Sequence, residues 1–307
     1  MSPRHTQTPP DAADAVPHWL VVGAGNIGTL AAWYLTSAGH GVTVLGPEPG
    51  TRSKTLIFAD GRDPVSFSLT SGPAVADDQP VTHLALACKT PFTHAVLDRL
   101  ALAPDIVVLR LQNGIADLHE RLPTNARLIE TVTTNAVRGR DPVHEVVAEN
   151  QTFMGDGSSH RPPWFDRLVA VWPGLEWTAD LRMRQWQKLV ANAAINPLTA
   201  IHDVSNGALV DDPAIHARLR DIVAEADRLL VLLDPRWPGN SLAGVEAVAR
   251  ATAANTSSMR ADVHAGSATE IDAINGWLIN QAHALGLRLY ANEATVAELQ
   301  QITGRHA

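Results

Sequence analysis

Hydrophobic and polar residues alternate along the first half of the chain in short runs that predict a strand and a helix in turn. "WLVV" (19–22) and "VTVL" (42–45) are rich in apolar and β-branched residues, and residues 26–38 between them have helical periodicity. "TLIFADGRDPVSFSLT" (55–70) has two similar runs on either side of an Asp-Gly pair. This arrangement predicts a hairpin.

The alternation continues to about residue 180. Strands are predicted at 83–88, 105–111 and 126–132, with a helix over about 92–102 and a short helix before the last of these strands. The strands are almost continuous in apolar residues, which is typical of a parallel sheet that is covered on both faces. The sequence therefore predicts an α/β fold with a Rossmann-type, doubly wound parallel sheet.

The pattern changes near residue 180. "LEWTAD" (175–180) is the last predicted strand. Only helical windows follow, at about 181–196, 213–233, 240–264, 267–285 and 291–302. We therefore predict three parts of the chain: a disordered tail at 1–17, an α/β domain at 18–180 and an all-helical C-terminal domain at 181–307.

Composition narrows the class of protein. The chain has 307 residues, of which 45% are hydrophobic and 18% charged, as in soluble globular proteins. Its net charge is −8 and it has no basic block, which disfavours a nucleic acid or an anionic membrane as partner. Cys88 is the only cysteine, the first 17 residues lack the apolar region of a signal peptide, and no apolar run approaches membrane-spanning length. We expect a cytoplasmic protein, and we predict no metal site.

A glycine-rich loop follows the first predicted strand. In "VVGAGNIG" the three glycines form G-x-G-x-x-G at the start of the first predicted helix. The first glycine allows a tight turn, the second lets the backbone approach a pyrophosphate, and the third lets helix and strand pack closely. We predict that this loop binds a dinucleotide on the helix N-terminal amides. Its residues are Gly23, Ala24, Gly25, Asn26, Ile27 and Gly28.

The choice of dinucleotide depends on the end of the second strand. An NAD site usually has Asp or Glu there to bind the ribose hydroxyls. This chain has Leu45-Gly46-Pro47, with Glu48 just beyond. Arg52 and Lys54 follow, and they either neutralise a 2′-phosphate or are solvated loop cations. The sequence favours NADPH as cofactor and leaves NADH open.

The first predicted helix of the second half carries a narrow polar stripe. In "QWQKLVANAAINPLTAI" (185–201), Lys188, Asn192 and Asn196 are spaced by four, and the rest of the helix is largely apolar. Polar groups against an apolar wall need partners. Reduction of a carbonyl needs a proton donor, which Lys188 could be, while the asparagines orient the ammonium or hold substrate oxygens. Alternatively, Lys188 reaches water and the asparagines cap a neighbouring turn.

A second candidate segment is "NTSSMRADVHAGSATEIDAINGWL" (255–278). Glu270 comes at the start of a helix with an apolar stripe, and the four residues 267–270 fit a capping box. From spacing alone, the capping box is the favoured interpretation. A functional Glu270 would instead bind a substrate hydroxyl or pair with Lys188.

Six segments in this order, "GAGNIG", "CKT", "LQNG", "QWQKLVANAAINPLTA", "NTSSM" and "TEIDAINGWL", give the chain a family resemblance. From about residue 19 to 290 it resembles the ketopantoate reductases (2-dehydropantoate 2-reductases) of pantothenate biosynthesis. The resemblance implies a Rossmann domain, a helical domain, and a cleft between them for NADPH and a branched 2-oxo acid. It also implies that Lys188 is the general acid and that Glu270 is the carboxylate that binds a substrate hydroxyl.

The same resemblance assigns further residues. It implies that substrate is held by Asn192, Asn196, Ser258 and, with a weaker match, Asn255. Asn113 and Lys89 match positions near the nicotinamide ribose and the substrate. Family members commonly carry an arginine just after the second strand to bind the 2′-phosphate. This chain has Gly46-Pro47 there, and this difference concerns the preference for NADPH over NADH. Relatives of this fold also act on other 2-oxo acids, including aryl ones with NAD. The sequence is compatible with a homodimer.

The sequence fits three other classes of protein less well. β-Hydroxyacid dehydrogenases use a K-x-x-x-N pair, which Lys188 and Asn192 satisfy, but "LRMRQWQK" lacks their usual G-x-x-G-x-G-x-x-x-K start. Short-chain dehydrogenases need Tyr-x-x-x-Lys, and neither Tyr34 nor Tyr290 has a lysine four residues later. A dinucleotide-sensing regulator would have no need of a buried ammonium.

Overall fold

The computed structural model describes residues 16–46, 49–72 and 80–304. The chain forms two compact units. The first contains the chain up to Ala87, Leu100–Leu111 and Pro123–Ala179, and the second contains Cys88–Arg99, Gln112–Leu122 and the chain from Asp180 onward. Of the predicted tail, residues 1–15 lie outside the described residues.

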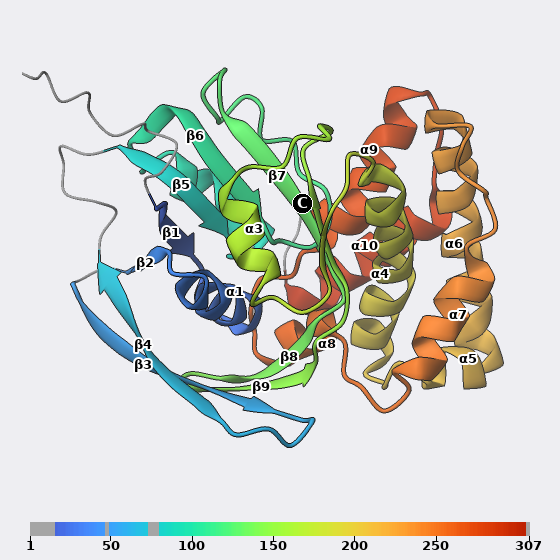
Figure 1. Cartoon of the computed structure of the whole chain (residues 1–307). Helices are drawn as coiled ribbons and strands as arrows, with labels where there is room; N and C mark the ends of the chain where they lie inside the picture. The colour runs from blue at the N-terminus through green and yellow to red at the C-terminus, as the bar shows by residue number, and fades with distance from the viewer. Residues whose placement is uncertain (1–15, 47–48, 73–79, 305–307) are drawn as a thin grey trace, which may run out of the picture. The chain divides into compact units, whose positions relative to one another are not determined.

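The first unit is built on one mixed sheet (Figure 1). Its neighbouring strands follow the order β11-β10-β7-β6-β5-β1-β2-β4-β3-β9-β8. The described residues of this unit also form α1 (Asn26–Ser37) and α3 (Trp164–Val169). The strands are β1 (His18–Val22), β2 (Gly41–Leu45), β3 (Gly50–Phe58), β4 (Val65–Gly72), β5 (Val81–Leu86), β6 (Leu102–Arg110), β7 (Arg127–Thr133), β8 (Ala136–Arg140), β9 (Val143–Ala148), β10 (Thr152–Gly155) and β11 (Leu175–Trp177).

The central part of this sheet has Rossmann topology. The strands β4, β2, β1, β5, β6 and β7 are neighbours in that order, and each adjacent pair is parallel. The chain leaves β1 through α1 toward β2 on one side, whereas β5 lies on the other side of β1. The order of the strands therefore reverses beside β1, and ligands of such sheets bind at the carboxyl ends of the strands at this reversal. The predicted α/β class is confirmed, and the glycine loop begins at this point.

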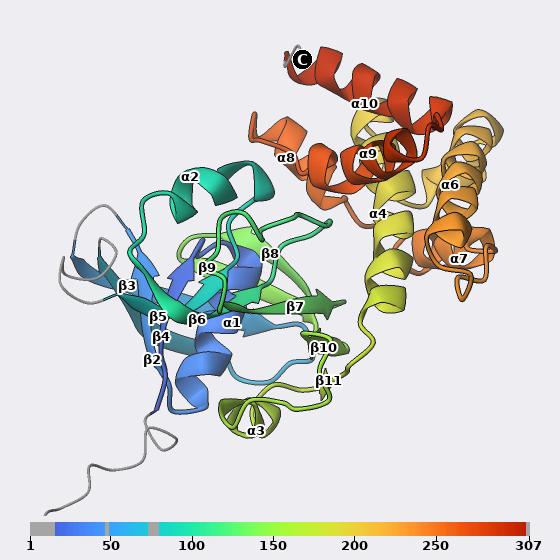
Figure 2. The same cartoon turned by 90° about the horizontal axis from the view of Figure 1, so that it is seen from above.

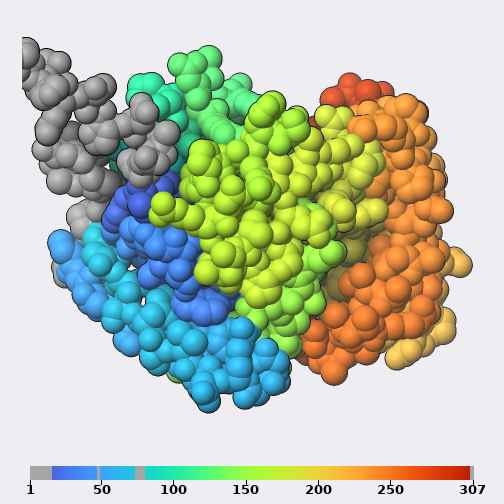
Figure 3. All heavy atoms as spheres, viewed as in Figure 1, coloured from blue at the N-terminus to red at the C-terminus, as the bar shows by residue number. Residues whose placement is uncertain are grey.

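Two hairpins extend the sheet beyond the Rossmann part. The pairs β3–β4 and β8–β9 are antiparallel, and β3 pairs in parallel with β9. The extended sheet passes beneath α1, and β8 contacts this helix (Figure 1). The outer side of the β3–β4 hairpin lies at the surface (Figure 3). This extension brings β3 and β9 under the glycine loop.

The core of the first unit is aromatic and aliphatic. Trp19, Tyr34 and Phe165 are fully buried, and the rings of Tyr34 and Trp172 stack with centroids 4.5 Å apart. Burial of apolar surface stabilises a fold by about 25 cal/mol per Å². The apolar face of α1 thus fixes the helix, and with it the glycine loop, on the sheet.

The second unit is helical. Its helix α4 contacts α6, α7, α8, α10 and a π-helix, and it lies among them (Figure 2). In the described chain after β11 there are only helices, which confirms the all-helical prediction. They are α4 (Arg182–His202), α5 (Ala208–Asp211), α6 (Pro213–Leu233), α7 (Leu242–Ala251), α8 (Ser258–His264), the π-helix Asp272–Gly276, α9 (Trp277–Ala284) and α10 (Tyr290–Thr303). The earlier segment Cys88–Arg99 adds a 3-10 helix, Thr90–Phe92, and α2 (Thr93–Leu97).

Several element predictions were wrong in extent. The helix predicted over 92–102 ends at Leu97, and β6 already begins at Leu102. The short helix predicted before 126 is absent, since residues 112–126 are described and form no helix. The single helix predicted over 240–264 is two helices, because Ser257 caps a new helix by accepting from the backbone N–H of Arg260 at 3.1 Å. The hairpin β8–β9, with two arginines in β8 and one glutamate in β9, was not predicted.

Among the described residues, no helix has the length and apolar character needed to cross a membrane.

Candidate active site

The glycine loop has the geometry that its three glycines predict. Gly23 has φ +94°, which favours glycine. A Cβ on Gly28 would lie 1.8 Å from the carbonyl oxygen of Gly23, so helix and strand can approach only without a side chain there. A Cβ on Gly25 would meet nothing within 4 Å. The exposed side of Gly25 therefore leaves room for a ligand against the backbone.

This loop also leads into a helix of twelve residues whose first turn has no acidic side chain. The first amides of a helix lack partners within the helix, and the helix dipole favours negative charge there. Gly25 is the N-cap residue and offers no side chain that could occupy these amides. The loop is thus suited to a pyrophosphate.

The two predicted cations on β3 lie in different environments. Arg52 is exposed, and its Nη2 lies 3.7 Å from the position that a Cβ on Gly46 would take. Gly46 directly follows β2. Lys54 is only 1% exposed, donates a hydrogen bond of 3.1 Å to the carbonyl oxygen of Ala24, and forms an ion pair with Asp141. Of these two residues, Arg52 is the one that offers a solvent-facing cation near the end of β2.

The polar stripe on α4 is present as predicted from the spacing. Lys188 and Asn192 are half-buried, and Asn196 is buried, with 8% of its surface exposed. Around them Leu189, Val190 and further residues of α4 belong to the core of the second unit. Within the part of the chain that the structure describes, the side-chain amides of Asn192 and Asn196 form no hydrogen bond. Such amides are well suited to substrate oxygens.

Glu270 lies in a cluster made from separate parts of the second unit. Its carboxylate accepts hydrogen bonds from the side chain of Asn113 at 3.1 Å and from the backbone N–H of Thr90 at 3.3 Å. Lys89, next to Thr90, forms an ion pair with Asp262 of α8. The capping-box interpretation of Glu270 is therefore wrong: residues 267–270 precede the helix, and the carboxylate binds other segments.

Both carboxyl groups of this cluster have a raised pKa. Burial raises the pKa of Glu270 above its usual range, although Asn113, Thr90 and Lys89 each act to lower it. Burial likewise raises the pKa of Asp262, against the opposing effect of Lys89. Perturbed carboxyl groups of this kind are common at functional sites.

The loop that carries Asn113 is docked on the π-helix. Gly114 has φ +73°, and the backbone N–H of Ile115 donates to the carbonyl oxygen of Ala273 at 2.8 Å. A Cβ on Gly114 would lie 2.3 Å from that same oxygen. On the other side of the loop, Gln112 donates to the carbonyl oxygen of Cys88 and to the hydroxyl of Thr93, both at 2.7 Å. Asn113 is thus held between the segment of Lys89 and the π-helix that follows Glu270.

A buried asparagine joins this cluster to α4. The amide of Asn275, in the π-helix, donates to the carbonyl oxygen of Ala193 at 3.0 Å and to Asn292 at 3.1 Å. Ala193 lies between Asn192 and Asn196. Buried side-chain bonds of this kind fix the relative position of packed helices. The π-helix after Glu270 and the stripe of α4 are therefore fixed to each other within the second unit.

The remaining predicted substrate residues lie at the surface. Asn255 and Ser258 are exposed, at the start of α8. The neighbouring Ser257 is the buried residue, and it accepts a hydrogen bond of 2.7 Å from the hydroxyl of Thr199 of α4. Ser257, Asp262 and Thr90 were not predicted from the sequence. Thr90 contributes its backbone N–H, so its role could not have been predicted from its residue type.

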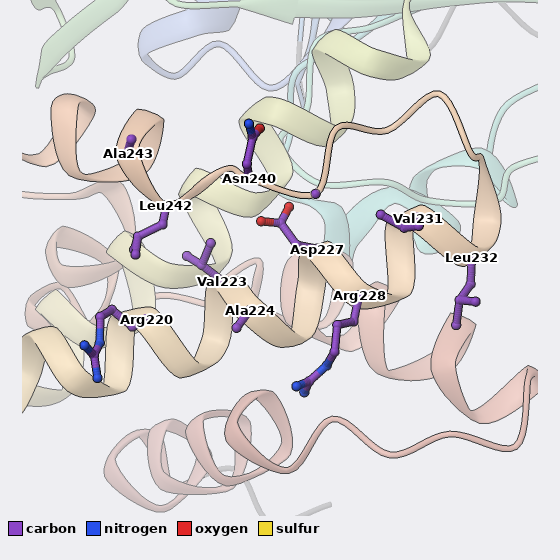
Figure 4. A pocket seen from close by; sticks show the side chains of 11 residues that line it. Arg220, Val223, Ala224, Asp227, Arg228, Val231, Leu232, Asn240, Leu242 and Ala243 are labelled. Carbon is purple, nitrogen blue, oxygen red and sulfur yellow. The ribbon is translucent and has the colours of Figure 1, made fainter.

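The second unit also has a groove of about 840 Å³ that is lined by no predicted site residue (Figure 4). It lies along α6 and the start of α7, whose surface is orange in Figure 3. Its Asp227 is already bound by Trp237 and Ser241. The lining residues are Arg220, Val223, Ala224, Asp227, Arg228, Val231, Leu232, Gly239, Asn240, Leu242 and Ala243.

Comparison with known proteins matches both halves of the chain. Residues 19–158 match the family model of ketopantoate reductase PanE/ApbA, and residues 180–303 match the model of its C-terminal part. The 2-dehydropantoate 2-reductase of Halobacterium salinarum is 28% identical over 302 residues, which cover 93% of this chain and 99% of that protein.

Solved structures show the same fold. The PanE/ApbA family ketopantoate reductase from Ralstonia eutropha JMP134 has a TM-score of 0.81 at 22% identity, covering 94% of this chain and 99% of its own. A ternary structure of D-mandelate dehydrogenase with NADH and anilino(oxo)acetate has a TM-score of 0.79 at 17% identity, covering 93% and 98%.

The Rossmann sheet with its glycine loop, the helical second unit and these relatives define an oxidoreductase that acts on a CH–OH group. The chain belongs to the ketopantoate reductase PanE/ApbA family. The prediction from sequence resemblance is confirmed, and a β-hydroxyacid dehydrogenase or a non-enzymatic sensor is not supported.

Proposed function

We propose that this protein reduces 2-dehydropantoate to pantoate with NADPH, with Lys188 as the proton donor. The observation that carries the proposal is the cluster of Glu270, Asn113 and Lys89, which is joined through Asn275 to the helix of Lys188. The substrate has a carboxylate, a 2-oxo group and a 4-hydroxyl. The ammonium of Lys188, the side-chain amides of Asn192 and Asn196, and the carboxyl group of Glu270 complement these three functional groups.

The residues of the first unit fit a dinucleotide. The open side of Gly25 and the amides at the start of α1 suit its pyrophosphate. The guanidinium of Arg52 beside Gly46 suits a 2′-phosphate, because NADP sites use an arginine near the end of the second strand. When bound, the reduced nicotinamide supplies the hydride.

The protein's own groups supply the rest of the chemistry. As the C2 carbonyl accepts the hydride, negative charge develops on its oxygen, and Lys188 donates a proton to it. Asn192 and Asn196 hold substrate oxygens without adding a charge that would neutralise the ammonium. Glu270 accepts a hydrogen bond from the 4-hydroxyl, and Asn113 orients its carboxyl group. Lys89, Asn255 and Ser258 complete the proposed set of substrate and cofactor contacts.

We expect Arg52→Ala to remove the preference for NADPH. A charge-assisted hydrogen bond contributes about 1.5–3 kcal/mol, so the affinity for NADPH should fall by about 10–100-fold. The affinity for NADH should stay within a factor of about three, since NADH lacks the phosphate. Titration of protein fluorescence with each dinucleotide measures both. An equal loss for the two cofactors would contradict a 2′-phosphate role for Arg52.

We expect Glu270→Gln to impair recognition of the 4-hydroxyl. KM for 2-dehydropantoate should rise by about tenfold, because the hydrogen bond from the hydroxyl loses its charged acceptor. The control is 3,3-dimethyl-2-oxobutanoate, which lacks only that hydroxyl. Steady-state kinetics should show the same KM for this control substrate in variant and wild type. A rise in KM for both substrates would place Glu270 elsewhere in the site.

A substrate panel tests the proposal as a whole. Steady-state rates with 2-dehydropantoate, pyruvate-like and aryl 2-oxo acids, each with NADPH and NADH, should be highest for 2-dehydropantoate with NADPH. The aryl acids are included because D-mandelate dehydrogenase shares the fold. Higher kcat/KM for an aryl acid with NADH would replace the proposed substrate and cofactor by that pair.

A further inference from the structure

We propose that Lys54, with Asp141 and His144, positions the glycine loop for the pyrophosphate of the dinucleotide, and that Lys54 does not bind the 2′-phosphate. This inference rests on the proposed function, because it concerns the same dinucleotide site. All four residues involved, Asn26 included, belong to the first unit. The structure thereby separates Lys54 from Arg52, which lies two residues earlier on β3.

The contact of Lys54 with the loop is made at one peptide unit. The carbonyl oxygen of Ala24 accepts hydrogen bonds from the ammonium of Lys54 at 3.1 Å and from the hydroxyl of Thr29 at 3.0 Å. In a planar trans peptide, the N–H points away from the C=O. The N–H of Gly25 therefore points to the side opposite Lys54, and Gly25 is exposed with open space beside it. Lys54 thus orients a donor of the kind that binds a pyrophosphate.

The ammonium of Lys54 is buried, so its charge needs a partner. Asp141, in the turn between β8 and β9, supplies this partner as an ion pair. The same carboxylate faces Nε2 of His144 at 3.0 Å. Burial acts to raise the pKa of Asp141, but hydrogen bonds from Lys54 and His144 outweigh it and hold this pKa below its usual range. Asp141 therefore stays charged, and Lys54 stays in place.

A second contact holds the other side of Gly25. Nδ1 of His144 lies 2.8 Å from the side-chain oxygen of Asn26, the first residue of α1, and His144 is only 2% exposed. Ala24 and Asn26, on either side of Gly25, are thus tied to the same group of side chains on β3 and β9. This arrangement fixes the loop before any ligand binds, and such preorganisation lowers the entropic cost of binding.

The test uses Lys54→Met, which keeps the length of the side chain and removes its charge. We expect dissociation constants for NADPH, NADH and ADP to rise by a common factor of about ten, because all three carry a pyrophosphate and the loop loses one charge-assisted hydrogen bond. Isothermal titration calorimetry measures all three on the full chain. Asp141→Asn should give a smaller common rise, and Lys54→Arg should restore part of the affinity.

Matched controls separate the alternatives. Arg52→Ala, on the same strand, should weaken NADPH alone. Loss of NADPH affinity alone in Lys54→Met would show that Lys54 binds the 2′-phosphate, and unchanged affinity for all three ligands would show a purely structural role; either result overturns the inference. Thermal melting of the unliganded variants shows whether they fold, and Asp141→Asn supplies the test if Lys54→Met does not. If wild type binds none of these ligands, the proposed function fails instead.

Discussion

Lys188→Ala is expected to lower kcat for 2-dehydropantoate by about 10²–10⁴-fold, because general acid catalysis contributes about that much to a rate. The affinity for NADPH should remain within severalfold, since the dinucleotide loop lies in the other unit. Stopped-flow measurement of NADPH oxidation separates the chemical step from product release. Unchanged turnover would remove Lys188 from the mechanism.

Two further variants distinguish proton donation from simple charge. Lys188→Arg keeps the positive charge, but a guanidinium remains protonated in proteins and is a poor proton donor. We expect it to recover substrate binding and not turnover. Gln187→Ala, at the exposed neighbouring position of the same helix, should leave kcat unchanged. Full activity of Lys188→Arg would mean that this position provides only charge.

Gly114→Ala is expected to lower kcat/KM by about 100-fold. Its Cβ would lie 2.3 Å from the carbonyl oxygen of Ala273, so the loop must move away from the π-helix and carry Asn113 away from Glu270. A displacement of about 1 Å at a catalytic site costs about 10²-fold in rate. Steady-state kinetics with 2-dehydropantoate, at saturating NADPH, measure the change.

Gly286→Ala is the matched control for this substitution. Gly286 has φ +72°, against +73° at Gly114, so alanine has the same backbone strain of about 1–2 kcal/mol at both positions. A Cβ on Gly286 meets nothing within 4 Å, however, so no segment is displaced. We expect Gly286→Ala to lower the melting temperature and leave kcat/KM unchanged. Equal kinetic losses in the two variants would show that strain, and not the position of Asn113, controls activity.

The sequence was sufficient for the features that depend on local pattern. The glycine loop follows a strand and begins a helix, and both neighbours are set by residues close in the chain. The stripe of Lys188, Asn192 and Asn196 follows from helical spacing alone, and α4 extends over it without interruption. Helix α6 has the limits that were predicted, because Asp212 caps it and Pro213 begins it.

The contacts of Glu270 could not be predicted from local pattern. Its partners Asn113 and Thr90 lie 157 and 180 residues away in the chain. A capping box is a local motif, and the four residues 267–270 satisfy it in sequence without forming it. The π-helix that follows accepts a hydrogen bond from the loop of Gly114, a contact that no sequence periodicity indicates.

The burial of Lys54 could have been predicted from the alternation of residues along β3. Side chains at alternate positions of a strand share one face, and Lys54 shares its face with Leu56 and Phe58, which are buried. A lysine on that face needs a buried partner, which Asp141 supplies from a hairpin that was not predicted. The residue could therefore have been placed inside, whereas its partner could not have been identified.

The most direct test of the central claim follows the hydride and the proton together. Wild-type protein is incubated with 2-dehydropantoate and NADPH in which both hydrogens at C4 of the nicotinamide are replaced by deuterium, and the product is analysed by mass spectrometry and NMR. The account predicts one enantiomer of pantoate with deuterium at C2, formed at a rate that Lys188→Ala lowers by about 10²–10⁴-fold. Pantoate without deuterium at C2, or formed equally fast by the variant, would contradict it.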